Sequence, residues 1–391
     1  MTIQSKKLSS FCRTGSGGTP SRSNSKFFEN GTIPWVKSGE LKNRYITSVE
    51  EYITELAVEK SSAKLVSKGS LLIAMYGATV GEVSQLTFDA TTNQAICNIA
   101  PDENVCDVNY LYRFLEASKP YLLSRRVGGG QPNISQGIIK DLEVPLPSLS
   151  EQRRIASILD KADELRQKRQ QAIEKLDQLL QATFLDMFGD FQINPMNWQT
   201  KPLSEVVNNT TIVTYGIVQA GEEYRDGIPY IRTGDIKNGS ILTENLSRTD
   251  PEIAKKFKRS EVQTGDIVMS IRATVGTTAL VPKILNGANL TQGTARIAVG
   301  ENIEREYALY HLRCQATQNW IQKQVKGATF REITLGKLRE LPVYLPPRDL
   351  QKKFVEIYNS IEMLKLNANK SLESSKQLFK SLQNQAFSGN L

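Results

Sequence analysis

The stretch Ile33-Pro-Trp-Val-Lys-Ser-Gly-Glu-Leu-Lys42 has a diverged copy 195 residues further along the chain, Ile228-Pro-Tyr-Ile-Arg-Thr-Gly-Asp-Ile-Lys237. A second pair, Ala78-Thr-Val-Gly81 and Ala273-Thr-Val-Gly276, recurs at the same interval. A repeat of about 200 residues is too long for one unit of a solenoid and has the size of a whole domain. The 391-residue chain is therefore predicted to contain two copies of one domain.

Both copies show the same internal order of predicted elements. A strand-rich segment with a short apolar run, Leu71–Met75 or Ile267–Ile271, precedes a helical stretch and a glycine-containing turn. Each copy ends in a proline block, after which a long helix is predicted to begin. The sequence therefore indicates an α+β protein, in which two tandem homologous α/β domains are separated by two long antiparallel coiled-coil helices. The expected segments are a first domain at 1–148, a first helix at 149–190, a second domain at 191–346 and a second helix at 347–391.

Both predicted helices carry apolar residues at alternating steps of three and four, the heptad pattern of helices that pair along their length. We expect these positions to face inward and to pair the two helices with each other. Ser148 or Ser150 is expected to cap the first helix, and Asp349 the second. The expected inward positions are Ile155, Ile158, Leu165, Leu176 and Leu179 in the first helix, and Phe354, Ile357, Ile361, Leu364, Leu378 and Leu382 in the second.

The composition favours a polyanion as partner. The chain has 49 basic and 41 acidic side chains, a formal net charge of +8, and nucleic acid is the commonest partner of such a basic protein. It has no apolar run of 18 residues, no secretory pattern and only four scattered cysteines. These features predict a cytoplasmic protein without a membrane segment, a disulfide framework or a cysteine-type zinc site.

The sequence offers little catalytic chemistry. His311 is the only histidine and is expected to be an ordinary surface or half-buried helix residue. Nucleotide-binding glycine motifs and a methyltransferase motif are absent. Glu40-Leu41-Lys42 and Asp235-Ile236-Lys237 have the acidic-x-Lys form of metal-dependent nucleases, but the upstream Asp226 of the second copy aligns with Gly31, and Glu29 of the first copy is out of register. We therefore predict no catalytic residue and no metal site, and interpret both motifs as polar strand ends.

Polar and basic loops occur in equivalent places in both copies, which favours nucleic-acid recognition. Arginine, asparagine and glutamine can pair with base edges, whereas lysine, serine and threonine more often hold phosphates. The candidate DNA-binding residues of the first copy are Thr19, Ser21, Arg22, Lys37, Ser38, Lys42, Thr79, Asn93, Gln94, Arg125, Arg126, Gln131 and Asn133. Those of the second copy are Arg232, Thr233, Lys237, Arg272, Thr274, Gln292, Lys323, Lys326, Thr329 and Arg331.

Taken together, these features resemble the DNA-sequence specificity (S) subunit of Type I restriction-modification systems. The resemblance rests on the duplicated blocks, on Val144-Pro-Leu-Pro-Ser-Leu-Ser-Glu-Gln-Arg-Arg-Ile155 before the first long helix, and on the tail Ala386–Leu391. It extends over nearly the whole chain. Asp349-Leu350-Gln351 departs from the pattern, since it stands where the first copy has Ser150-Glu151-Gln152.

The resemblance implies a non-catalytic subunit of a methyltransferase and endonuclease complex used in phage defence. Two target-recognition domains are expected to read the two parts of a bipartite double-stranded DNA site, with the long helices as a spacer between them. Two modification subunits, which methylate adenine, are expected to dock on the helices, and restriction subunits complete the complex. The implied cofactors are S-adenosylmethionine, ATP and magnesium, all in partner subunits and none in this chain.

Three alternatives remain open from the sequence. The first is a specificity protein of a related modification or defence system without a translocase, which gene neighbours would reveal. The second is a stand-alone nuclease, which would cut plasmid DNA with magnesium and no partner. The third is a duplicated scaffold that does not bind DNA, which would show no salt-sensitive DNA binding even with modification subunits present.

Overall fold

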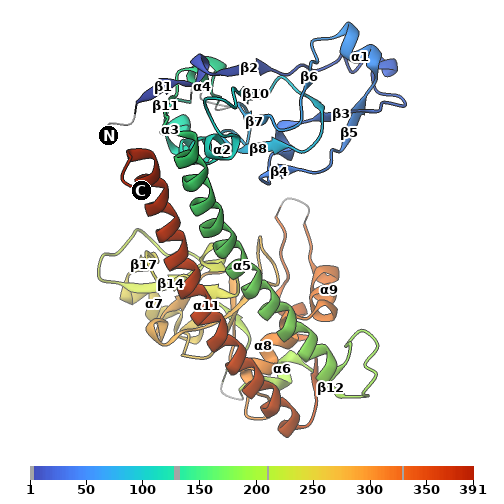
Figure 1. The fold of residues 1–391 in the computed structure, drawn as a ribbon. Coiled ribbons are helices and arrows are strands. Elements are labelled where there is room, and N and C mark those ends of the chain that lie inside the picture. The colour runs from blue at the N-terminus through green and yellow to red at the C-terminus, as the bar shows by residue number, and fades with distance from the viewer. Residues whose placement is uncertain (1–3, 127–132, 209–210, 328–329) are drawn as a thin grey trace. The chain divides into compact units, whose positions relative to one another are not determined.

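The computed structural model describes residues 4–126, 133–208, 211–327 and 330–391 (Figure 1). The chain divides into two compact units, Met1–Gln170 with Lys370–Leu391, and Gln171–Asn369. The long helices α5 (Leu149–Phe188) and α11 (Arg348–Ser388) each contribute residues to both units. Among the described residues, neither these helices nor any shorter one combines the length and apolarity of a membrane span.

The first unit is built on a five-stranded sheet and a four-stranded sheet. The larger has the order β2-β10-β7-β8-β4, and the smaller has the order β5-β3-β9-β6. A short pair joins β1 to β11, the strand that precedes α5 in the sequence. The strands are β1 (Ser5–Lys7), β2 (Cys12–Ser16), β3 (Ile33–Val36), β4 (Tyr45–Ile46), β5 (Glu51–Ile53), β6 (Leu65–Val66), β7 (Leu71–Ala74), β8 (Val83–Leu86), β9 (Ala90–Thr92), β10 (Ile96–Pro101) and β11 (Glu143–Pro145). The short helices are α1 (Glu55–Lys60), α2 (Val108–Ala117), α3 (Lys119–Ser124) and α4 (Gln136–Lys140).

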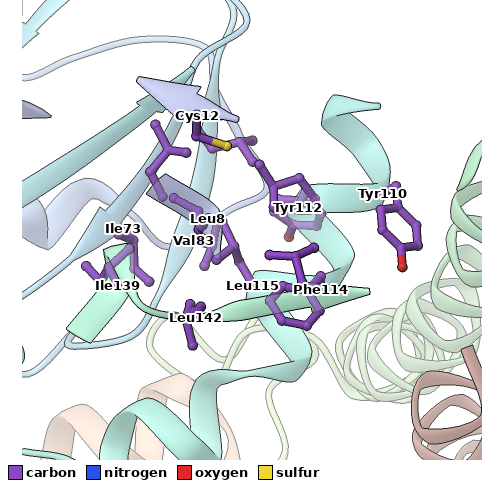
Figure 2. Close-up of a cluster of buried hydrophobic side chains, with 14 of the residues drawn as sticks. Leu8, Cys12, Ile73, Val83, Tyr110, Tyr112, Phe114, Leu115, Ile139 and Leu142 are labelled. Carbon is purple, nitrogen blue, oxygen red and sulfur yellow. The ribbon is translucent and has the colours of Figure 1, made fainter. Parts of the chain in front are cut away.

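The apolar run predicted as a strand, β7, is central because both of its faces are covered. Alternate side chains of a strand point to opposite faces, and Leu71 and Ile73 join the core that includes α2 and the start of α5. Figure 2 shows part of this core, with Ile73 and Val83 from the sheet and Leu115 from α2. Leu72, on the opposite face, joins a second cluster. Burial on both faces explains why this strand is a continuous apolar run.

The second unit repeats this plan with fewer paired strands. The order β13-β21-β18-β19 matches β2-β10-β7-β8, and β17-β14-β20 matches β5-β3-β9. In the first unit β3 pairs in parallel with β9, and in the second unit β14 pairs in parallel with β20. β9 and β20 are the strands that follow β8 and β19 in the sequence. The strands are β12 (Gln199–Pro202), β13 (Thr214–Tyr215), β14 (Ile228–Ile231), β15 (Ile236–Lys237), β16 (Ser240–Ile241), β17 (Arg248–Thr249), β18 (Ile267–Ser270), β19 (Thr278–Leu280), β20 (Asn289–Leu290), β21 (Thr294–Ile297) and β22 (Pro342–Leu345). The short helices are α6 (Leu203–Val206), α7 (Pro251–Lys256), α8 (Arg305–Arg313), α9 (Gln315–Gln324) and α10 (Leu335–Arg339).

A buried glutamine joins each long helix to its domain. The Gln152 side chain accepts a hydrogen bond from the backbone N–H of Asp107 (2.8 Å) and donates to two backbone carbonyls. Gln351 accepts in the same way from the N–H of Glu304 (2.9 Å). The two helices begin 199 residues apart, as the two glutamines do. The departure at Asp349-Leu350 therefore leaves the register of the second helix unchanged.

The helix caps follow the prediction in the first helix only. The Ser148 hydroxyl accepts a hydrogen bond from the N–H of Glu151 (3.3 Å), as a capping residue does. In the second helix the prediction was wrong, because Asp349 lies inside the first turn of α11 rather than before it.

Within each unit the two long helices pack against each other and run in opposite directions. In the first unit the Arg169 guanidinium donates to the backbone carbonyl of Ser371 (3.0 Å). In the second unit the Lys365 ammonium pairs with the Asp177 carboxylate (2.7 Å). The fold class is therefore confirmed: two tandem homologous domains accompany two long antiparallel helices.

The predicted heptad seam was wrong at five of its eleven positions. Ile155, Phe354 and Ile361 are buried, and Ile158, Leu176 and Leu382 are half-buried. In contrast, Leu165, Leu179, Ile357, Leu364 and Leu378 are exposed, between 38% and 55% of their surface. The side chains buried in their place are Leu159, Ile173, Leu180, Leu372 and Phe379.

The error has a physical cause in the polar residues of the buried row. Asp163 is buried and Arg166 half-buried in the inward row of the first helix, and Lys365 is half-buried in that of the second, so these rows look solvent-facing in the sequence. These groups are paired within the structure; Arg166, for example, binds the Asp163 carboxylate at 2.6 Å. Because buried charges persist only when they are paired, the row can face inward without being apolar.

His311 also differs from its prediction, because it is fully buried rather than at the surface. Its Nε2 accepts a hydrogen bond from the N–H of Tyr344 (3.3 Å), and its Nδ1 lies 3.4 Å from the Thr317 hydroxyl. The Phe191 ring lies 5.0 Å from the imidazole. Burial lowers the pKa of His311 from 6.5 to about 3, so the ring stays neutral in the folded protein.

We predict an acid-sensitive stability that depends on His311. Between pH 6.5 and about 3 the unfolded chain binds a proton at this residue and the folded chain does not. The free energy of unfolding should therefore fall by about 1.4 kcal/mol for each pH unit below pH 6.5. Urea unfolding of the wild type and of His311→Gln, between about pH 7 and 5, measures this difference while most carboxylates remain ionised. Parallel loss of stability in both proteins would contradict the assignment.

Candidate nucleic-acid interface

Four loops of the first unit meet at one end of its sheets. After β2, the N–H of Gly18 donates to the carbonyl of Thr92 (2.8 Å). After β9, the N–H of Asn93 donates to the carbonyl of Val36 (3.0 Å). The loop after β7 joins them through the Thr79 hydroxyl, which donates to the Ser38 carbonyl (2.9 Å). The loops that carry most of the first copy's predicted DNA-binding residues are therefore adjacent.

The equivalent loops of the second unit also meet. The N–H of Gln292 donates to the carbonyl of Ile217 (2.9 Å), and the N–H of Ala273 donates to the carbonyl of Arg331 (3.0 Å). Gly293 is in close approach, since a Cβ there would lie 2.9 Å from the Thr233 methyl group. Arg272, Thr233, Gln292 and Arg331 are therefore brought together from four separate segments.

Two glutamines hold equivalent places in these loop clusters. Gln94 follows β9 and Gln292 follows β20, the strands that pair in parallel with β3 and β14. The Thr19 hydroxyl donates to the Gln94 side chain. Since both copies have a glutamine there, it is suited to a feature that the two bound sites share, whereas neighbours that differ, such as Asn93 and Thr291, are suited to sequence-dependent contacts.

The turn that follows the central apolar strand, β7 or β18, is strained in the second copy. In the first copy Gly77 takes the left-handed conformation, with φ of +80°. The second copy lacks this glycine, and Ala273 takes a φ of +57° instead. A non-glycine residue in this region costs about 1–2 kcal/mol. Such strain is common at functional loops, and here it falls between Arg272 and Thr274, two of the predicted DNA-binding residues.

Several predicted phosphate-binding cations are already paired within the chain. Lys37 binds Glu50 (2.8 Å) and Glu51 (3.0 Å), and its hydrogen bond to Glu50 raises the pKa of Lys37. Arg22 binds Glu51 (2.6 Å) and lies over the Phe28 ring. In the second unit Arg232 binds Asp235 (3.1 Å) and Arg272 binds Glu332 (3.1 Å). Their role in DNA binding stays a prediction, and it requires exchange of these carboxylates for phosphates.

The carboxylates of the two acidic-x-Lys motifs hold turns. Glu40 accepts hydrogen bonds from the backbone N–H groups of Lys37 (2.6 Å) and Glu50 (2.8 Å). Asp235, which is buried, accepts from the N–H of Arg232 (2.9 Å). Within the described parts of the chain, no group of three or more histidine, cysteine, aspartate or glutamate side chains is placed to hold a metal ion.

The remaining candidates lie in different places. Lys42, Lys237 and Lys326 are exposed and make no ion pair with any described residue. Lys323 lies elsewhere, beside Trp320 in a hollow of about 420 Å³ between α9 and β22. Arg125 lies over the Tyr121 ring, Arg126 bonds to the carbonyl of Leu123, Ser21 bonds to Ser23, and Asn133 is bridged to Tyr76. Gln131 and Thr329 lie outside the described residues.

The sequence interpretation missed two exposed aromatic residues at these loops. Tyr76 of the first unit is 40% exposed, and Phe330 of the second unit is 87% exposed. Tyr76 directly precedes Gly77 and Phe330 lies three residues after Gly327, in segments whose predicted DNA-binding residues are polar or basic. An aromatic residue within a loop rich in basic and glycine residues is the signal that could have found them.

A duplicated α/β domain with polar loops gathered at one end of each copy is typical of the class of proteins that recognise two sites with two related domains. The comparison with known families makes this specific. The chain belongs to the family of the Type I restriction modification DNA specificity domain, whose model matches residues 2–175 and again 195–374. Each match contains one copy of the repeated blocks.

Individual relatives agree with this family. The chain is 33% identical over 168 residues to the Type I restriction enzyme EcoR124I/EcoR124II specificity subunit of Escherichia coli, covering 42% of this chain and 41% of that relative. It is 25% identical over 381 residues to the MjaIX specificity subunit of Methanocaldococcus jannaschii, covering 89% and 84%. The chain is also similar in fold to a solved structure whose subject is complex assembly and conformational transition of the type I R-M system. The TM-score is 0.60 at 18% identity, and the match covers all of both chains.

Proposed function

We propose that this protein is the DNA-specificity subunit of a Type I restriction-modification complex and reads a bipartite double-stranded target. The observation that carries the proposal is the duplicated loop cluster, in which equivalent segments meet at one end of the sheets in each unit. Each cluster offers amide and hydroxyl side chains that can bond to base edges or phosphates, Asn93 and Gln94 in the first unit and Thr291 and Gln292 in the second. The chain is a recognition subunit, and its relatives are named as specificity subunits.

The long helices supply the docking surface for the modification subunits. Leu165, Leu179, Ile357, Leu364 and Leu378 are exposed at a spacing of seven or fourteen residues on the two helices. Exposed apolar side chains at heptad positions are the surface against which another helix packs. These residues were expected to face inward, and their exposure indicates instead a face that a partner helix covers.

The remaining parts of the complex follow from the same proposal. Two modification subunits bind S-adenosylmethionine and methylate adenine after they flip the base out of the duplex. Restriction subunits bind ATP and magnesium and cut DNA. This chain supplies the recognition surface and the scaffold and binds none of these cofactors itself.

The test is co-expression of this chain with the modification subunit of the same system, followed by sequencing of methylated bases in the host genome. We expect one split motif with methyladenine in both parts. The chain expressed alone, and the modification subunit expressed alone, are the controls and should leave the genome without this motif. A continuous motif, or no motif from the assembled complex, would overturn the proposal.

A further inference from the structure

Phe330 is the most exposed large hydrophobic side chain among the described residues, at 87% of its surface. Residues of this kind are usually buried, because each aromatic side chain can remove roughly 150–250 Å² from water. An aromatic ring that stays exposed to solvent at a predicted recognition loop is therefore unusual and calls for a functional explanation. Two other apolar residues of this unit are strongly exposed, Ile193 at 75% and Ile284 at 74%, and both lie in other segments of the sequence.

The base of the Phe330 loop is fixed by backbone hydrogen bonds. The N–H of Lys326 donates to the carbonyl of Glu332 (2.9 Å), and the N–H of Glu332 donates to the carbonyl of Lys326 (3.0 Å). Gly327 has a φ of +86°, and a Cβ there would lie 2.2 Å from the Phe330 carbonyl oxygen. Only glycine fits this position. These contacts tie together the described residues on both sides of 328–329, and Phe330 is one of them.

The surroundings of the ring are cationic and polar rather than apolar. Lys326 makes no ion pair with a described residue, and Arg331 bonds to the Gln322 side chain. Arg272 shares this site through its ion pair with Glu332. An apolar protein partner would bury these cations at a cost. Nucleic acid fits both features, since phosphates pair with the cations and a base stacks on the ring.

We propose that Phe330 stacks on a base of the half-site read by the second unit, at a step that its ring unstacks. Apolar side chains that enter a duplex in this way open the step and widen the contact surface. The proposal rests on the proposed function and names a specificity element that acts through stacking. The first copy has Gln131 at the aligned position, so this contribution belongs to the second half-site alone.

The experiment uses the assembled complex with modification subunits and a duplex carrying the motif that the wild type methylates. A base–aromatic stack contributes roughly 1–3 kcal/mol, so Phe330→Ala should weaken binding by about 5- to 150-fold. Phe330→Trp should keep wild-type binding, and Ile284→Ala is the matched exposed control that should change nothing. The slope of log affinity against log salt should be unchanged in Phe330→Ala, whereas Lys326→Gln should lower it by about 0.9.

A second readout locates the open step. 2-Aminopurine placed at successive positions in the second half-site should become fluorescent at one step with the wild type and Phe330→Trp, but not with Phe330→Ala. Equal binding by wild type and Phe330→Ala would overturn the proposal. Dissociation of the modification subunits from Phe330→Ala during gel filtration would also overturn it, because the ring would then contact a protein. A wild-type complex without any split motif overturns the proposed function and this inference together, whereas the other outcomes overturn the inference alone.

Discussion

Replacement of Arg113 by methionine should destabilise the first unit by about 3–5 kcal/mol. The guanidinium is 1% exposed and binds the carboxylates of Asp160 (2.7 Å), Glu116 (2.9 Å) and Asp163 (3.1 Å). Methionine fills a similar volume but leaves the half-buried Glu116 without its ion pair and the buried Asp163 with Arg166 as its remaining cation. Burial already raises the pKa of Glu116 above its usual value even with Arg113 beside it. Loss of the cation should therefore lower the free energy of unfolding of the first unit.

Urea unfolding followed by circular dichroism measures this effect, and the two units should unfold in separable transitions. Only the transition of the first unit should move. Arg154→Met is the matched control, because Arg154 pairs with Glu151 at the surface (2.6 Å) and such pairs contribute no more than about 1 kcal/mol. An Arg113→Met protein as stable as this control would show that the buried ion cluster does not hold the first domain on its helix.

Insertion of seven residues into both long helices should widen the gap between the half-sites by about three base pairs. The insertions follow Gln170 and Asn369, where the two units meet along the chain. Seven helical residues add about 10 Å at 1.5 Å per residue, and DNA rises about 3.4 Å per base pair. A heptad preserves the seam on both helices, and the Arg169–Ser371 contact shows that the two helices pair and must be lengthened together.

The matched control is insertion of two residues at the same places. It rotates each seam by about 200° and should abolish assembly with the modification subunits. Methylome sequencing reads the gap in each variant. An active seven-residue variant that keeps the original gap would show that the helices do not set the spacing.

The duplication and the two long helices could be predicted from the sequence because they rest on local patterns. Proline blocks and the repeated Ala-Thr-Val-Gly turn recur at nearly constant intervals. The seam phase could not be predicted in the same way, because its inward rows contain Asp163 and Lys365. Whether such a row faces inward depends on partners from the other helix, which lie about 200 residues away in the sequence.

The candidate site shows the same limit. The loops that carry Thr79 and Gln292 could be located from the repeat, but the pairing of Lys37 with Glu50 and of Arg272 with Glu332 depends on tertiary folding. The burial of His311 likewise depends on the remote residues Phe191 and Tyr344. The positions of the loops could therefore be predicted from the local sequence. Which charged side chains are paired at each loop could be learned only from the structure.

The most direct test exchanges one recognition domain and reads the methylated motif. Residues 1–148 are replaced by the aligned segment of a relative that has a different target, while the long helices are kept. Methylome sequencing of cells that also express the modification subunit should then show one half-site changed and the other half-site and the gap unchanged. A change in both half-sites, or in neither, would contradict the conclusion that each copy of the domain reads its own part of the DNA.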